Sequence, residues 1–95
     1  MYVPDITRLF KGAGNEFEVE IVFAEQAGSS PKESHPFHEV VVVTSGSITV
    51  ERSDGEKTRT YSQYSLIEIP AGVEHVISSN GTPTKIVIIH PNRKE

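Results

Sequence analysis

The sequence has no cysteine and no tryptophan, and only 7% of its 95 residues are aromatic. Without cysteine the chain can form no disulfide and can bind no metal through thiolates. Any metal site must therefore use histidine or carboxylate side chains. A protein without disulfides also suits the reducing cytosol.

A surplus of positive charge and a long hydrophobic run are both missing. The formal net charge is −4, and the nine lysines and arginines are scattered, so no basic patch for nucleic acid forms. No apolar stretch is long enough to span a bilayer, and no apolar run follows a basic start. We therefore expect a soluble cytoplasmic protein that binds neither nucleic acid nor a membrane.

Helical periodicity is almost absent, and short strands separated by turn residues take its place. Asp54-Gly55 predicts a hairpin, and Ala71-Gly72, Asn80-Gly81 and the run Gly12-Ala13-Gly14-Asn15 mark further turns. This spacing predicts one all-β antiparallel domain over residues 1–95, a small sandwich or barrel, with an N-terminal arm (1–6) and a polar tail (91–95). Strands are predicted at residues 7–10, 17–25, 47–52, 57–61, 66–69, 75–78 and 85–90, and residues 27–34 are predicted to be a loop.

The strand predicted at residues 17–25 alternates two sets of side chains. Phe17, Val19, Ile21 and Phe23 form one set. The other set consists of Glu18, Glu20, Val22 and Ala24. Strict alternation of this kind is typical of a half-buried strand.

Residues 33–46 hold the densest group of chemically active side chains. Two histidines and two glutamates occur within seven residues, and four consecutive valines follow. Because every second side chain of an extended chain points to the same side, one face is predicted to carry Glu33, His35, Phe37 and Glu39 together with Val41 and Val43. His38 falls on the opposite face with Val40 and Val42. Charged groups that face a core must be paired, hydrogen-bonded or coordinated to a metal.

A second group, Pro70-Ala71-Gly72-Val73-Glu74-His75, follows thirty residues downstream. Together the two stretches resemble the cupin superfamily of small β-barrels. His35, Glu39 and Gly46 fit the second histidine, the glutamate and the glycine of the first cupin motif, and Pro70, Gly72 and His75 fit the second motif. The resemblance spans roughly residues 31–90 and implies a single small antiparallel β-barrel of the double-stranded β-helix, or jelly-roll, type.

The resemblance also implies a divalent metal ion, such as iron, manganese, nickel or zinc, held by His35, Glu39 and His75. This chain departs from the family pattern at three positions. Glu33 stands where the leading histidine is expected, Tyr64 where the second motif begins with glycine, and Ser79 where an asparagine is expected. Imidazole and carboxylate both bind divalent first-row metals. Glu33 is therefore predicted as a fourth ligand, with a hydrogen-bonding partner, a base or a solvent-exposed carboxylate as alternatives.

Two functions from different classes fit these residues. One is a metal-dependent enzyme acting on a small molecule, and the resemblance implies dioxygenation or isomerisation of an organic acid, a sugar or a phenolic compound. The other is a non-catalytic cupin that binds a small ligand in the barrel, with or without metal. His38 is predicted to face outward. His90 shares its face with Ile86 and Ile88, so it is predicted to reach the lumen as a hydrogen-bonded core histidine rather than a ligand.

The valine run from Val40 to Val43 is apolar on both faces, so its outer face must also be covered. Either the N-terminal strand or a second subunit would cover it. Cupins often form dimers, and twofold pairing is the commonest symmetry of soluble oligomers. We therefore expect a homodimer.

Overall fold

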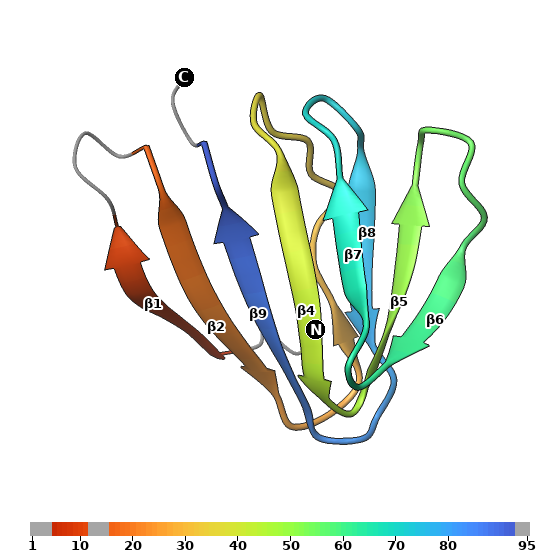
Figure 1. Ribbon diagram of the computed structural model, residues 1–95. Helices are drawn as coiled ribbons and strands as arrows, with labels where there is room; N and C mark the ends of the chain where they lie inside the picture. Colours follow the sequence, from red (N-terminus) through yellow and green to blue (C-terminus); the bar gives the residue numbers. More distant parts are fainter. Residues whose placement is uncertain (1–4, 12–15, 93–95) are drawn as a thin grey trace.

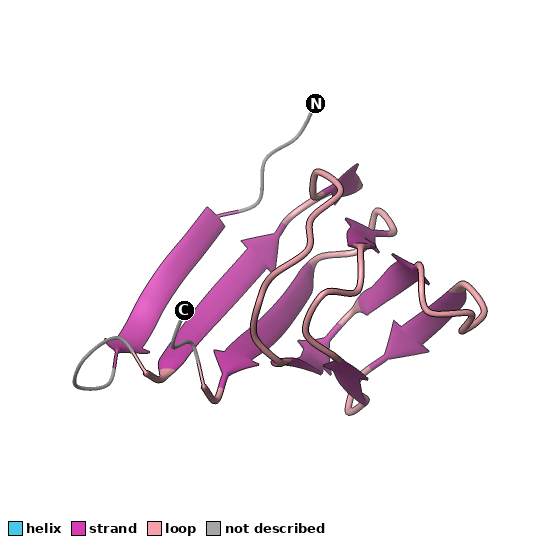
Figure 2. Cartoon of the chain, turned by 90° about the horizontal axis from the view of Figure 1, so that it is seen from above, coloured by secondary structure: helices cyan, strands magenta, loops and turns pink. Residues whose placement is uncertain are grey.

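The computed structural model describes residues 5–11 and 16–92, with side chains for residues 16–92. Nine strands form two antiparallel sheets in this part of the chain, and it contains no helix (Figures 1 and 2). No described segment can therefore be a membrane-crossing helix. The first sheet has the order β1-β2-β9-β4-β7 and consists of β1 (Asp5–Lys11), β2 (Glu18–Ala24), β9 (Thr84–His90), β4 (Glu39–Ser45) and β7 (Leu66–Ile69).

The second sheet has the order β3-β8-β5-β6. Its strands are β3 (Gly28–Ser29), β8 (His75–Ser79), β5 (Ser47–Arg52) and β6 (Arg59–Ser62). Most strands that follow one another in sequence, such as β4 and β5, lie in different sheets, as in a jelly roll, whereas β1–β2 and β5–β6 pair within one sheet. The all-β antiparallel prediction is confirmed, although the two sheets keep separate hydrogen-bonded ladders and do not close into one continuous barrel.

Several predicted boundaries differ from the structure. The strand predicted at residues 7–10 begins at Asp5, so two residues of the predicted arm belong to β1, while residues 1–4 and the predicted turn at 12–15 lie outside the described residues. The predicted loop at 27–34 contains the short strand β3. Strand β6 begins at Arg59 rather than at residue 57, and the extended run from Glu33 becomes a strand only at Glu39. The β-propensity of the residues predicts where these strands lie but not where they end, because hydrogen-bonded pairing with other strands decides where each strand begins.

The hydrophobic core lies between β4, β7 and β9 of the first sheet and β5 of the second. It consists of seven buried side chains: Val41, Val43, Ile48, Val50, Ile67, Ile69 and Ile86. Two strands of the first sheet, β2 and β9, face β3 and β8 beyond this core, and there the space between the sheets stays open. The candidate site occupies that space.

Candidate metal centre in the pocket between the sheets

A pocket of about 400 Å³ lies between the two sheets. Glu33, His35, Phe37 and Glu39 all line it, so the predicted alternation of side chains holds even though residues 34–38 form no strand. His75 enters from the start of β8, because the backbones of Glu33 and His75 pair as an isolated antiparallel bridge with N···O distances of 3.0 and 2.8 Å. This bridge joins the two chemical stretches of the sequence across the pocket.

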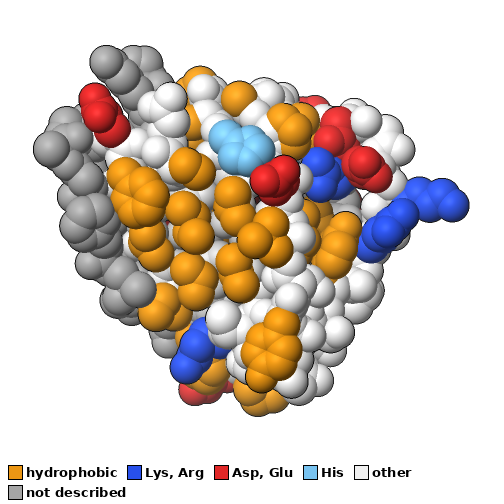
Figure 3. Space-filling view, viewed as in Figure 1, with side chains coloured by type: hydrophobic (Ala, Val, Ile, Leu, Met, Phe, Trp, Pro, Cys, Tyr) orange, Lys and Arg blue, Asp and Glu red, His pale blue; other side chains and the backbone are white. Residues whose placement is uncertain are grey.

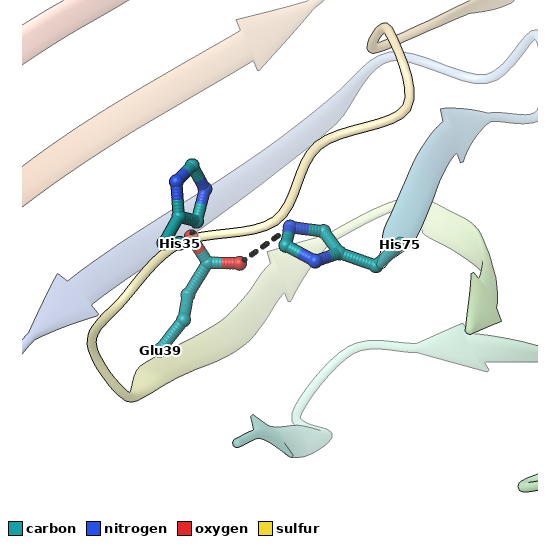
Figure 4. Close-up of side chains that lie close together, drawn as sticks. All are labelled: His35, Glu39 and His75. Carbon is teal, nitrogen blue, oxygen red and sulfur yellow. Dashed lines mark ion pairs between the residues drawn. The ribbon is translucent and has the colours of Figure 1, made fainter. Parts of the chain in front are cut away.

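His35, Glu39 and His75 point toward one another (Figure 4), and their nearest ligand atoms all lie within 4.8 Å of one another. The His75 Nε2 atom is 3.2 Å from Glu39 Oε2, and the His35 Nε2 atom is 3.8 Å from Glu39 Oε1. The His35 ring stacks on Phe37, with ring centroids 4.9 Å apart and planes 6° from parallel. Two imidazole nitrogens and one carboxylate thus surround a common point.

The orientation of His75 suits a metal ligand. Its Nδ1 atom lies 3.0 Å from the carbonyl oxygen of Val73, and since a carbonyl only accepts, Nδ1 carries the proton and donates it. Its Nε2 atom is then the one that faces Glu39. Metal-binding histidines usually donate their second ring N–H to such an acceptor, which fixes the tautomer.

Glu39 is only 3% exposed, and its Oε2 atom is buried without a hydrogen bond of acceptable geometry. Burial acts to raise the pKa of its carboxyl group, but interactions with His75 and His90 outweigh burial and lower that pKa from 4.5 to about 2. Interaction with Glu39 in turn raises the pKa of His75 above 6.5, against the effect of burial. Glu39 is therefore ionised, with Oε1 facing His90 and Oε2 facing His75.

The predicted fourth ligand, Glu33, reaches the pocket from its rim. Its Oε2 atom lies 3.4 Å from His35 Nε2, and its side chain is 40% exposed. It is not part of the group of three that converge within 4.8 Å. Glu33 therefore contacts His35 but does not converge with Glu39 and His75. His38, which is half-buried, does not line the pocket.

The prediction of His90 as a hydrogen-bonded core histidine in the lumen is confirmed, whereas the sequence predicted no role for Glu18. His90 is 5% exposed, and its two ring nitrogens lie 3.0 Å from Glu18 Oε1 and 2.8 Å from Glu39 Oε1. Burial acts to lower the pKa of His90, but Glu39 and Glu18 outweigh it and raise that pKa above 6.5. His90 thus connects Glu39 with a second buried carboxylate.

Glu18, Glu20 and His90 form a second group whose ligand atoms lie within 4.8 Å of one another. The two glutamates belong to β2 and His90 belongs to β9. Strand β2 turns the set that contains both glutamates toward the pocket, with Glu18 1% exposed, whereas a half-buried strand normally turns its more apolar set toward the core. The signal was present in the sequence, as two glutamates on one face of a strand. Alternation alone did not say which of the two sets faces the core.

Residues 19–90 match the family model of the cupin domain. The chain belongs to the cupin family. This cupin has no match among curated proteins. The predicted resemblance is confirmed over most of the sequence, and the two motif stretches meet at one pocket as the family pattern requires.

Solved structures show the same fold as this cupin. An RmlC-like cupin family protein with a double-stranded β-helix fold from Methanocaldococcus jannaschii has a TM-score of 0.83 at 12% identity, with 96% of this chain and 82% of that chain covered. A cupin-2 domain containing protein from Shewanella frigidimarina has a TM-score of 0.69 at 25% identity, over 96% and 81%. The DMSP lyase DddQ from Ruegeria pomeroyi has a TM-score of 0.80 at 16% identity, over 97% and 47%.

Proposed function

We propose that this cupin binds a divalent metal ion through His35, Glu39 and His75 and uses the adjoining pocket to hold a small organic molecule. The convergence of the three ligand atoms within 4.8 Å is the observation that carries the proposal, because it brings two imidazoles and the buried, ionised carboxylate of Glu39 to one point. Imidazole and carboxylate together are a donor set for divalent first-row metals. Glu33, next to His35, is proposed as a fourth donor or as the acceptor that orients His35.

The donor set narrows the choice of metal. Nitrogen and oxygen donors without sulfur suit iron, manganese, nickel or zinc. Such an ion supplies Lewis acidity at the positions that the protein leaves open. An oxidoreductase or isomerase reaction is the enzymatic form of the proposal, and the non-catalytic form is a metal-dependent binding protein. The fold does not choose between them, since one scaffold supports many chemistries.

Metal analysis tests the site. Protein purified without chelator is expected to contain about one divalent ion per chain by elemental analysis, and calorimetric titration of the chelator-treated protein should recover that stoichiometry. His75→Ala and Glu39→Gln should each lose the ion, whereas His38→Ala, outside the pocket lining, should keep it. Equal metal content in all three variants, or none in the wild type, would refute the proposal.

The pocket lining indicates the charge of the ligand. Four glutamates line it (Glu18, Glu20, Glu33 and Glu39), and no lysine or arginine does so among the described residues. A divalent ion together with one protonated histidine offsets only three of these negative charges. The remaining wall is apolar, with Ile77 and Ile88 among its side chains. We therefore propose a neutral or positively charged apolar molecule rather than an organic acid.

Three small probes of similar shape test the ligand class: benzylamine, benzyl alcohol and benzoate. Benzylamine should bind at least tenfold more tightly than benzoate to the chelator-treated protein, with benzyl alcohol between them. Glu20→Gln should reduce that ratio, because it removes one negative charge without changing the size of the side chain. If benzoate binds most tightly, the ligand class is wrong while the metal site is untouched.

We also propose a homodimer formed through the outer face of the first sheet. Hydrophobic side chains gather on the face that this sheet turns toward the viewer (Figure 3), and Leu66 is 62% and Tyr64 81% exposed. A second copy would cover this surface. Sedimentation is expected to give a dimer at micromolar concentration, and Leu66→Glu should shift the equilibrium toward monomer. A wild-type monomer at that concentration would refute the dimer.

A further inference from the structure

His90 lies at the end of β9 with a carboxylate on each side of its ring. The neighbouring strand β2 supplies one of them, since Glu18 is the register partner of His90. The strand on the other side, β4, supplies Glu39. All three residues are at most 5% exposed. Because they come from three adjacent strands of one sheet, their relative positions are fixed by its ladders.

Each ring nitrogen of His90 faces an oxygen that can only accept a hydrogen bond. The Nδ1 atom is 3.0 Å from Glu18 Oε1, and the Nε2 atom is 2.8 Å from Glu39 Oε1. An imidazole that donates at both nitrogens bridges its two acceptors. The bond to Glu39 reaches Oε1 only, and Oε2 is left on the side of His75.

We propose that His90, held by Glu18, is a positioning residue that fixes the Glu39 carboxylate so that Oε2 is the atom presented to the metal. His90 is not itself a ligand of this ion, because its Nε2–H is directed at Glu39 Oε1 and it does not belong to the group formed by His35, Glu39 and His75. Hydrogen bonds to ligating carboxylates commonly set metal affinity in this way. The inference rests on the proposed metal site and assigns roles to two residues outside it.

Two substitutions at position 90 separate the two hydrogen bonds. His90→Gln places an amide N–H near the position of the ring Nε2 and so keeps the donor to Glu39. His90→Asn places its amide near Nδ1 and keeps only the contact with Glu18. Both variants remove the ring from the same buried position, so each serves as the control for packing in the other.

The readouts are the affinity for Co²⁺ by titration, the visible absorption spectrum of the bound Co²⁺, and the melting temperature of the metal-free protein. His90→Asn is expected to lose about 10- to 100-fold in affinity with an altered spectrum. His90→Gln is expected to stay within about threefold of the wild type, with a spectrum close to it. The melting temperatures of the two variants should fall by similar amounts.

Equal affinities in the two variants, whether both normal or both reduced, would overturn the positioning role, since packing alone would then explain the result. A wild-type protein that binds no Co²⁺ would instead overturn the metal site itself. The two failures are therefore distinguishable.

Discussion

Tyr64 shows how one residue departs from the pattern around it. It occupies the position at which the second cupin motif begins with glycine. Its backbone has a φ of 89°, a conformation that only glycine adopts without strain. Its side chain is 81% exposed, so few contacts compensate for the strain. The positive φ explains why glycine suits this position in the cupin motif, and this chain places a tyrosine there in the same backbone conformation.

Tyr64→Gly is expected to raise the free energy of unfolding by about 1 kcal/mol, because relief of strain exceeds the added entropy of the unfolded chain. The neighbouring Gln63 is also exposed but has no positive φ, so Gln63→Gly should lower stability. Urea denaturation of both variants measures the difference. A loss of stability in Tyr64→Gly would show that the tyrosine makes a contact outside the isolated chain, such as the proposed dimer interface.

The histidines next to Glu39 predict how the metal-free protein responds to pH. Their pKa values are raised in the folded state, so their contribution to stability is complete below about 6.5 and is lost as pH rises through the folded pKa. The pKa of Glu39 is lowered from 4.5 to about 2, so its contribution to stability is complete above about 4.5 and is lost as pH falls from there to about 2.

The melting temperature in chelator should therefore fall between pH 6 and pH 9. Saturating metal should reverse this trend, since ligands must lose their protons before they bind. The double variant His75→Gln, His90→Gln should show a flatter pH profile in chelator. A melting temperature that rises with pH in the metal-free wild type would contradict the assignment.

At the scale of elements, the passage from β4 to β5 decides how the two sheets are joined. Gly46 makes this passage with a φ of 75°, and a Cβ atom there would collide with the Pro83 carbonyl and with Thr84. The hydroxyl of Thr84, 2% exposed, accepts a hydrogen bond from the Ser47 N–H at 3.2 Å. The first-motif glycine is therefore required both for its backbone conformation and for this close approach to β9.

Gly46→Ala is expected to lower the free energy of unfolding by about 2–4 kcal/mol, from backbone strain together with the steric clash. Gly55 is the matched control, because its φ of 88° is similar but a Cβ there would meet nothing within 4 Å. Gly55→Ala should cost only about 1 kcal/mol. Equal losses measured by chemical denaturation would mean that the approach to Thr84 is unimportant.

At the scale of the whole molecule, the two sheets separate a packed region from an open one. The seven-residue core fills the space beside β5 and β7, while β2 and β9 face β3 and β8 across the pocket. Strand β2 contributes Glu18 and Glu20 to this pocket together with Val22 and Ala24. The homodimer, the cytoplasmic location and the metal remain predictions at this scale.

Much of the fold could be predicted because its signals are local. Asp54-Gly55 and Asn80-Gly81 both place a glycine at positive φ in the structure, at 88° and 92°, as the turn chemistry required. Alternation around Glu39 correctly assigned the inward-facing side chains, since the period of an extended chain is two. Strand ends were less well predicted, because hydrogen-bonded partners elsewhere in the chain set them.

The sequence by itself determined the all-β class, because turn residues and side-chain alternation are properties of neighbouring residues. Its two spaced motifs carried the resemblance to cupins, and that resemblance implied that His35, Glu39 and His75 converge. Only the tertiary structure decided that β2 turns Glu18 inward. It also decided that His90, 51 residues after Glu39 in the sequence, reaches the Oε1 atom of Glu39. The face that a strand buries depends on what covers its other side. No alternation within the strand contains that information.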